Sequence, residues 1–252
     1  MRLDKFLAEK YKSRTKAAEA IDGGLVKING KVVAPSYDFK EGDKLEIIQA
    51  EERFVSNGGY KLSKALKDFG FSVEGKTFID VGASNGGFTD CLLQNGAKKV
   101  YCIDVGESQL DNSLKDKNVI VMDNFNARDL TKDVFPEKID GAVIDVSFIS
   151  LTYVLKNVAD VIEDNDFIIA LIKPQFECES KKVGKNGIVK EASVHKKILI
   201  KILEYARDIG LSAKNLTNAP IKQGKNLEYL ALFQKKRNDG INMNELIKYV
   251  KL

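Results

Sequence analysis

Charged residues that follow short apolar runs are the part of this sequence whose types and spacing could do chemistry. The runs are rich in β-branched and aromatic residues, which is typical of buried strands. If these strands are parallel, their carboxyl ends meet at one edge of a sheet, where α/β proteins bind ligands. The sequence therefore predicts a polar rim of four carboxylates and one amine, namely Asp80, Asp104, Asp123, Asp145 and Lys173.

A glycine-rich turn within residues 77–88, TFIDVGASNGGF, predicts what this rim binds. A strand enters the turn and an apolar helix follows it, so that backbone N–H groups at the start of the helix would face a ligand. The spacing differs from the G-x-G-x-x-G of dinucleotide enzymes, which disfavours a dehydrogenase. An acid at the end of the strand would repel a pyrophosphate and attract a sulfonium or ammonium group. The pattern favours S-adenosylmethionine over a mere tight turn, with contacts from Asp80, Gly82, Ser84, Gly86 and Gly87.

The composition is that of a globular protein with one large domain, or with one medium and one small domain. Of the 252 residues, 44% are apolar and 30% are charged. The longest apolar run, residues 167–172, is much shorter than a membrane span, and the first ten residues carry acids where an export signal is apolar. Three scattered cysteines and one histidine lack metal-ligand spacing. We therefore expect no metal, no disulfide framework and a cytoplasmic location.

Charge is distributed unevenly along the chain. Residues 1–33 contain eight Lys or Arg against four Asp or Glu, and the remaining residues hold 32 of each sign. The net charge of +4 therefore arises in the first segment. A local basic excess favours a polyanionic partner such as RNA, although a solvated helical face would give the same count.

The first 50 residues predict a small α+β domain. Apolar side chains at helical spacing indicate a first helix between Leu3 and Tyr11. Ser13 can cap a second helix, which ends at a glycine pair. Asn29-Gly30 accepts the positive φ angles of a two-residue hairpin turn, and a further strand is expected at 44–48.

Residues 51–59 are predicted to be an interdomain linker. The pair Gly58-Gly59 makes a flexible joint credible, and a helix over about 60–69 then opens the second domain, residues 60–252. His195 is expected on the surface of a lysine-rich helix.

Strands and helices alternate through the second domain. Repeated βα units predict an α/β fold with a doubly wound, mostly parallel sheet. Seven strands are expected, at 77–81, 100–103, 119–122, 141–144, 167–172, 212–216 and 229–233, with helices at 88–93, 148–162 and 192–209.

The N-terminal domain resembles the RNA-binding domain named after small-subunit ribosomal protein four. The resemblance rests on the pattern from Ser13 to Val33, in which the cap, the glycine and the hairpin fall in register. It implies that two helices present basic side chains to structured RNA, where phosphate contacts supply affinity and orientation. The candidate RNA-binding residues are Arg2, Lys5, Lys12, Arg14, Lys16 and Lys31.

The chain as a whole resembles the TlyA family, bacterial proteins known both as haemolysins and as rRNA 2′-O-methyltransferases. The segments that carry this resemblance are DVGASNGGFTDCLLQNGAKKVYCIDVG, DVSFISL, LIKPQFE and NLEYL. It implies a Rossmann-like class I methyltransferase domain of the FtsJ type, which uses S-adenosyl-L-methionine to methylate ribose, with a cytidine of ribosomal RNA or of a ribosomal subunit as target. It further implies catalytic residues at Lys61, Asp145, Lys173 and Glu228, and cofactor contacts at Gly82, Gly86, Phe88, Asp104 and Asp123.

Two lysines and two carboxylates suit this chemistry. Desolvation and a neighbouring positive charge disfavour an ammonium, so Lys173 beside Lys61 could accept the proton of a ribose hydroxyl. Asp145 and Glu228 would orient the two amines. Alignment of the hydroxyl oxygen, methyl carbon and sulfur can remove roughly 7–11 kcal/mol of the barrier.

Other functions remain open at this point. A membrane-active haemolysin would need a spanning segment or a strongly amphipathic exposed helix, and the sequence contains neither. A non-catalytic RNA-binding factor in ribosome assembly would keep the fold without the chemistry, but all four catalytic residue types are present. A base methyltransferase with Cys178 as its nucleophile is disfavoured, because a small packing residue is the commoner role for a cysteine at such a position.

Overall fold

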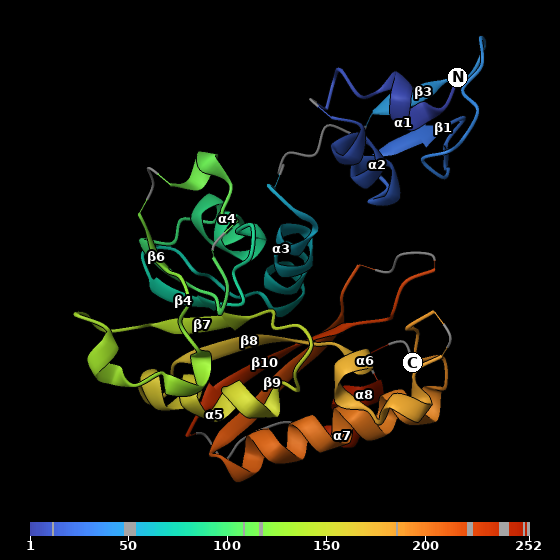
Figure 1. The fold of residues 1–252 in the computed structure, drawn as a ribbon. Coiled ribbons are helices and arrows are strands. Elements are labelled where there is room, and N and C mark those ends of the chain that lie inside the picture. The colour runs from blue at the N-terminus through green and yellow to red at the C-terminus, as the bar shows by residue number, and fades with distance from the viewer. Residues whose placement is uncertain are drawn as a thin grey trace. The chain divides into compact units, whose positions relative to one another are not determined.

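The computed structural model describes residues 1–11, 13–47, 54–107, 109–115, 118–184, 186–220, 224–236, 242–248 and 250. They belong to two compact units, Met1–Arg53 and Phe54–Leu252, and each unit is described by itself (Figure 1). Lys12, Ile48 and the first three residues of the predicted linker lie outside the described residues.

The first unit packs two short helices against a small antiparallel sheet. The helices are α1 (Leu3–Phe6) and α2 (Arg14–Asp22), and the strands β1 (Val26–Ile28), β2 (Lys31–Val32) and β3 (Leu45–Ile47) pair in the order β2-β1-β3. As predicted, the Ser13 hydroxyl caps α2, accepting a hydrogen bond from the Lys16 N–H at 3.0 Å. Asn29 and Gly30 have φ angles of 50° and 77°, as the hairpin turn requires. The core consists of Leu3, Leu7, Ala17, Ala20, Ile21, Val26 and Ile28.

The second unit is built on a seven-stranded sheet in the order β6-β5-β4-β7-β8-β10-β9. Of the seven strands, β10 alone runs opposite in direction to the other six, so the predicted doubly wound, mostly parallel sheet is confirmed. The strands are β4 (Thr77–Val81), β5 (Lys99–Ile103), β6 (Val119–Met122), β7 (Gly141–Ile144), β8 (Phe167–Ile172), β9 (Leu211–Asn218) and β10 (Tyr229–Lys235).

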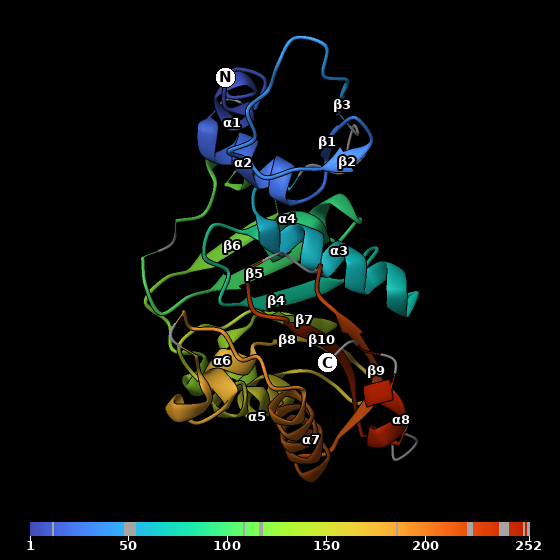
Figure 2. The ribbon, with the colours of Figure 1, turned by 90° about the vertical axis from the view of Figure 1, so that its right-hand side faces the viewer.

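Helices cover both faces of this sheet (Figures 1 and 2). Strand side chains alternate between the faces, so that Phe78 packs with α3 and α4, whereas Ile79 packs with the core of α5, α7 and α8. The α-helices are α3 (Asn57–Phe69), α4 (Gly87–Gln94), α5 (Thr152–Val161), α6 (Pro174–Glu177), α7 (Ala192–Asp208) and α8 (Met243–Lys248). Short 3₁₀ helices lie at η1 (Asn112–Leu114), η2 (Ala127–Asp129), η3 (Lys132–Val134) and η4 (Ser180–Lys182).

The prediction of a flexible joint at Gly58-Gly59 is wrong. Helix α3 begins at Asn57, and Ser56 caps it by accepting a hydrogen bond from the Gly58 N–H at 3.3 Å. Gly59 lies directly under Phe54, whose ring leaves no room for a Cβ. These glycines therefore permit close packing at the start of a helix, a role that sequence alone does not distinguish from flexibility.

The predicted helix over 148–162 is also shorter than expected. Phe148 has a φ angle of 66°, in the left-handed region, and α5 begins only at Thr152. The segment between β7 and α5 is consequently a loop, and it carries part of the site described below.

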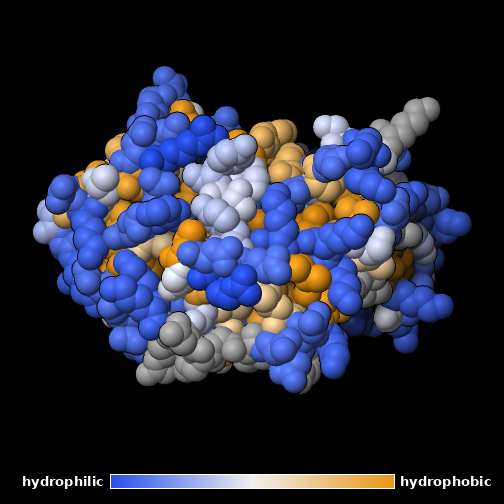
Figure 3. All heavy atoms as spheres, turned by 90° about the horizontal axis from the view of Figure 1, so that it is seen from below, coloured by the Kyte–Doolittle hydropathy of each residue, from blue (hydrophilic) through white to orange (hydrophobic). Residues whose placement is uncertain are grey.

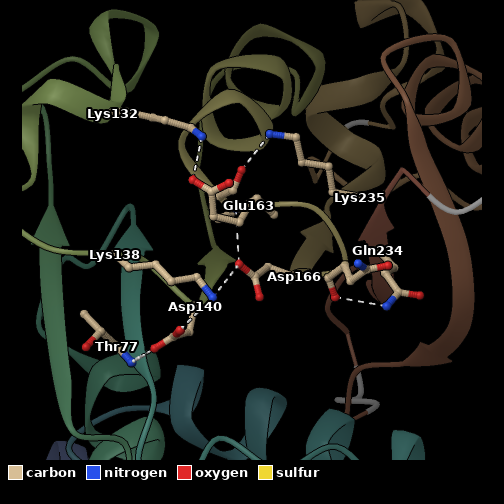
Figure 4. Close-up of polar contacts among 10 residues, drawn as sticks. Thr77, Lys132, Lys138, Asp140, Glu163, Asp166, Gln234 and Lys235 are labelled. Atoms are coloured by element: carbon tan, nitrogen blue, oxygen red, sulfur yellow. Dashed lines mark hydrogen bonds and ion pairs between the residues drawn. The ribbon is translucent and has the colours of Figure 1, made fainter.

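Charged residues at the edge of the sheet where β4, β7 and β8 begin bind one another and the backbone (Figure 4). Asp140 accepts a hydrogen bond from the Thr77 N–H at 2.9 Å, and Lys138 lies 3.3 Å from Asp140 and 3.5 Å from Asp166. Nearby contacts join Lys132 to Glu163, Lys235 to the Ile162 carbonyl, and Gln234 to the Asn165 carbonyl. The polar groups at this edge thus bind one another, whereas the candidate site lies at the other ends of these strands.

We expect Gly59→Ala to lower the free energy of unfolding by about 1–3 kcal/mol, because the added methyl group overlaps Phe54 in a packed core. Gly58→Ala is the matched control, because its added Cβ would lie 3.3 Å from its nearest neighbour, Phe88, and so would not overlap it as the Cβ at Gly59 overlaps Phe54. Urea denaturation of both variants measures the difference. Equal stability of the two variants would contradict the proposed packing of Phe54.

Candidate active site at the carboxyl ends of the strands

The glycine turn after β4 follows a path that side chains would block. Gly82 has a φ angle of 83°, and a Cβ there would lie 2.7 Å from the carbonyl oxygen of Asp145. At Gly86, with a φ angle of 88°, a Cβ would lie 2.5 Å from Leu114 and 2.6 Å from Leu110. A Cβ on Gly87 would collide with the Ser56 hydroxyl. Glycine is therefore required at these positions for backbone conformation, for close approach, or for both.

A cavity of about 170 Å³ lies between this turn and the end of β7. Its wall includes six of the predicted residues, from the turn and from the rim. Other lining residues were not predicted from the sequence, among them Ser56, Asn85 and Ser147. Of these, Ser147 could have been predicted to line the site, because it lies two residues after Asp145 in the segment DVSF. The lining residues are Ser56, Gly58, Gly82, Ala83, Ser84, Asn85, Gly87, Phe88, Asp145, Ser147 and Lys173.

Lys173 is held by two partners at the wall of this cavity. Its Nζ forms an ion pair with Asp145 and donates a hydrogen bond to the Ser147 hydroxyl at 2.7 Å. Only 10% of the lysine side chain is exposed. Asp145 and Ser147 follow β7 and Lys173 follows β8, so the parallel pairing of these two strands brings the three side chains together.

The second lysine of the predicted set has a carboxylate of its own. Lys61 Nζ, on α3, lies 2.6 Å from Glu228 Oε2. Antiparallel pairing places Tyr229 opposite Ile172, so Glu228 precedes β10 beside the residue that follows β8, Lys173. The four predicted catalytic residues thus form two lysine–carboxylate pairs. The pairing of strands brings Asp145, Lys173 and Glu228 to one edge of the sheet, and α3 carries Lys61 to Glu228.

Asp80 does not occupy the place expected of it. It lies inside β4 rather than at its end, is fully buried, and does not line the cavity. Its Oδ2 accepts a hydrogen bond from the Thr89 hydroxyl of α4 at 2.7 Å. Burial raises the pKa of Asp80 to about 7. The prediction that the Asp80 carboxylate faces a cationic ligand directly is therefore wrong. The reason is that β4 continues for one residue beyond Asp80.

Asp104, by contrast, anchors the glycine turn. It follows β5, and its carboxylate accepts hydrogen bonds from the Ser84 N–H at 2.9 Å and the Gly106 N–H at 3.2 Å. Asp123 follows β6 and is exposed. Neither residue lines the cavity, so their contact with a cofactor stays a prediction.

Of the predicted RNA-binding residues, those that the structure describes lie on the surface of the first unit. Arg2 and Arg14 both bind the buried Asp4, at 2.8 and 3.1 Å, while about half of each arginine side chain stays exposed. The hydrogen bond from Arg2 lowers the pKa of Asp4 to about 2. Lys5, Lys16 and Lys31 are exposed. A buried carboxylate thus fixes two guanidinium groups, which the sequence did not indicate.

The prediction of a surface histidine is wrong. His195 is 2% exposed, and its ring nitrogens are hydrogen-bonded to the Val189 carbonyl at 2.9 Å and to the Tyr229 hydroxyl at 2.8 Å. Helical spacing within α7 turns this residue inward beside Val194 and Ile198.

Cys178 is half-buried and packs against the core, in agreement with its predicted role. Within the described ranges, no group of three or more His, Cys, Asp or Glu residues could hold a metal ion.

Comparison with known proteins identifies both units. An FtsJ-like methyltransferase family model matches residues 54–236, and an S4 domain model matches residues 1–45. Hemolysin A of Brachyspira hyodysenteriae is 44% identical over 239 residues, which are 92% of this chain and 99% of that protein. TlyA of Mycobacterium tuberculosis, a 16S/23S rRNA (cytidine-2'-O)-methyltransferase, is 36% identical over 222 residues, 86% of this chain and 83% of that protein. A solved structure from Streptococcus thermophilus, described as a candidate hemolysin, is 39% identical with a TM-score of 0.74, covering 98% of this chain and 94% of that one.

These matches agree with the fold. The family match begins at Phe54, where the second compact unit begins, and it includes every strand of the seven-stranded sheet. The predicted class I methyltransferase architecture is confirmed. The chain belongs to the FtsJ-like methyltransferase family and carries an S4 domain ahead of its methyltransferase unit.

Proposed function

We propose that the chain is an S-adenosylmethionine-dependent 2′-O-methyltransferase that acts on the ribose of a cytidine in structured ribosomal RNA. The observation that carries this proposal is the position of Lys173, whose amine is held by Asp145 and Ser147 at the wall of the cavity that the glycine turn lines. The relative from Mycobacterium tuberculosis, named for methylation of cytidine in 16S and 23S rRNA, supports the choice of substrate.

The residues present fit the cofactor. Gly82 and Gly87 line the cavity without side chains, and the turn leads into the first residues of α4. Backbone N–H groups and small side chains line the cavity, so a ligand can approach the main chain closely. When bound, S-adenosylmethionine supplies an electrophilic methyl group on a sulfonium. Asp104 would bind the ribose hydroxyls of the cofactor and keep the turn in place.

Lys173 would take the proton of the attacking 2′-hydroxyl. Proton transfer to a positioned side chain is the usual way in which an enzyme activates a hydroxyl group, and Lys173 is the side chain that the site would offer for it. As the proton passes from the hydroxyl to Lys173, the oxygen would bond to the methyl carbon and the carbon–sulfur bond would break, so that a neutral thioether leaves. Asp145 and Ser147 would keep Nζ directed toward the oxygen. Lys61 and Glu228 would hold the other side of the ribose.

The first unit would supply most of the RNA affinity. Its half-exposed arginines and exposed lysines can bind phosphates, which contribute affinity and orientation with little reading of the bases. Asp4 preorganises two of these cations, Arg2 and Arg14, by holding their guanidinium groups in place.

A membrane-active haemolysin is the alternative, and it rests on the name of the relative from Brachyspira hyodysenteriae. In the part of the chain that the structure describes, no helix is both long and apolar enough to cross a membrane. On the face drawn in Figure 3, hydrophilic side chains predominate and hydrophobic ones form small groups between them. Release of haemoglobin from red cells by the purified protein, with Lys173→Ala as active as the wild type, would favour this alternative.

Asp104→Ala should weaken binding of S-adenosylmethionine tenfold or more, because it removes charge-assisted hydrogen bonds and releases the glycine turn. Calorimetric titration of the full chain measures this affinity. Glu107→Ala, at an exposed position three residues further on, is the matched control and should bind normally. An unchanged affinity for Asp104→Ala would mean that the adenosine binds elsewhere.

Neutralising exposed lysines of the first unit should weaken RNA binding and flatten its salt dependence. Each lost phosphate contact lowers the log–log slope by about one unit. We expect this for Lys16→Gln and Lys31→Gln, measured on ribosomal RNA transcripts over a range of salt concentrations, while cofactor affinity stays constant. Lys156→Gln, on α5 of the second unit, serves as the control. If Lys16→Gln and Lys31→Gln both kept the wild-type slope, as the control should, the RNA-binding role of the first unit would be refuted.

Lys173→Ala should slow methyl transfer by roughly 10²–10⁴-fold, the usual effect of losing a general base, with little change in cofactor binding. Lys173→Arg should not restore the rate, because a guanidinium does not release its proton at usable pH. Single-turnover rates at saturating RNA measure both effects. If Lys173 only bound a phosphate, the alanine variant would react normally at saturating RNA and arginine would substitute well.

A further inference from the structure

We propose that Glu177 is a positioning residue, whose buried carboxylate ties the loop after β7 to the segment after β8 and so holds Lys173 against Asp145 and Ser147. This inference rests on the proposed function, since it concerns the same lysine. Glu177 does not line the cavity and therefore acts through its neighbours.

The carboxylate of Glu177 is fully engaged. Its Oε1 accepts a hydrogen bond from the Leu151 N–H at 2.6 Å, and its Oε2 accepts one from the Ser150 hydroxyl at 2.6 Å. Lys201, on α7, lies 3.7 Å from Oε2 and also donates to the Glu177 carbonyl at 3.3 Å. The glutamate side chain is 2% exposed, so these contacts are shielded from water.

The two segments that Glu177 joins are those that carry the candidate base and its partners. Ser150 and Leu151 end the loop that begins with Asp145 and Ser147. Glu177 ends α6, which starts directly after Lys173. Any shift between the two segments would therefore change the distance from Lys173 to its two partners.

The loop is strained and needs to be held at both ends. Phe148 has a φ angle of 66° and is 87% exposed, so burial of its side chain does not fix its backbone. A bulky residue keeps such a conformation only where its surroundings impose it. Before Phe148, the Asp145 N–H donates to the Val81 carbonyl at 2.9 Å, and Ser147 binds Lys173. After Phe148, the loop is held by the two hydrogen bonds to Glu177.

A ring contact joins the same two segments. The centroids of Phe148 and Phe176 lie 5.1 Å apart, and Phe176 immediately precedes Glu177.

Burying a carboxylate is costly unless its hydrogen bonds are made, and desolvation does raise the pKa of Glu177. An apolar side chain would fill this space without that cost but could not accept the two hydrogen bonds from Ser150 and Leu151.

The test compares Glu177→Ala with Glu177→Gln in the full chain. Glutamine can still accept from the Leu151 N–H through its oxygen and can donate to the Ser150 hydroxyl. We expect Glu177→Ala to raise hydrogen exchange across residues 145–155 tenfold or more and to lower the single-turnover rate about 10²-fold, the cost of a displacement near 1 Å. Cofactor affinity should stay within twofold. Glu177→Gln should resemble the wild type in all three measurements.

Two variants serve as controls. Lys201→Ala removes the cation but leaves both hydrogen bonds, and Glu179→Ala removes an exposed carboxylate two residues away; both should behave as the wild type. If Glu177→Ala does not fold, Ser150→Ala removes one of the two hydrogen bonds from the opposite side and should raise exchange and lower the rate in the same sense.

Unchanged exchange over residues 145–155 in a folded Glu177→Ala or Ser150→Ala protein would overturn the proposal, as would a Glu177→Gln protein as impaired as Glu177→Ala. Hydrogen exchange needs no turnover, so it tests the role of Glu177 even if the wild-type protein methylates no ribose. Failure of the wild-type protein to methylate ribose would refute the proposed function, whereas the exchange measurement would still decide the role of Glu177.

Discussion

The close approach of Gly82 to the backbone of Asp145 is the constraint on which the site depends. A Cβ at Gly82 would lie 2.7 Å from the Asp145 carbonyl oxygen, so the turn after β4 and the loop after β7 can lie side by side only with glycine at this position. The Asp145 N–H in turn donates to the Val81 carbonyl at 2.9 Å. Through this contact, the turn proposed to bind the cofactor and the lysine proposed to accept a proton line one cavity.

Carboxylates have three different tasks around this contact. Asp145 and Glu228 each pair with a lysine at the rim. Asp104 and Glu177 accept backbone hydrogen bonds and fix loops, which satisfies donors that would otherwise stay unpaired. Asp80 is buried under the turn, where desolvation raises its pKa to about 7 and a threonine hydroxyl binds it. Acids that look alike in the sequence thus differ in role because their solvation and their partners differ.

Pairing each lysine with its own carboxylate gives the site geometric definition rather than stability. Partly buried ion pairs often contribute little net stability, because desolvation offsets the attraction between the charges. They do fix the directions of long side chains. Lys173, which is 10% exposed and bound to both Asp145 and Ser147, has little freedom left to lose when a substrate binds.

The sequence by itself determined the seven strands of the large sheet and its longer helices in their order along the chain, the need for glycine in the turn, and the residue types of the rim, because hydrophobic periodicity and turn chemistry are local properties. Only the tertiary structure decided which residues meet. It placed Asp80 inside its strand, turned His195 inward, and made Gly58-Gly59 the tightly packed start of α3 rather than a joint. It also joined Glu177 to Ser150 and Leu151, which lie 27 and 26 positions away. Such contacts depend on the register between strands and on burial, which bring distant residues together and leave no periodic signal in the chain.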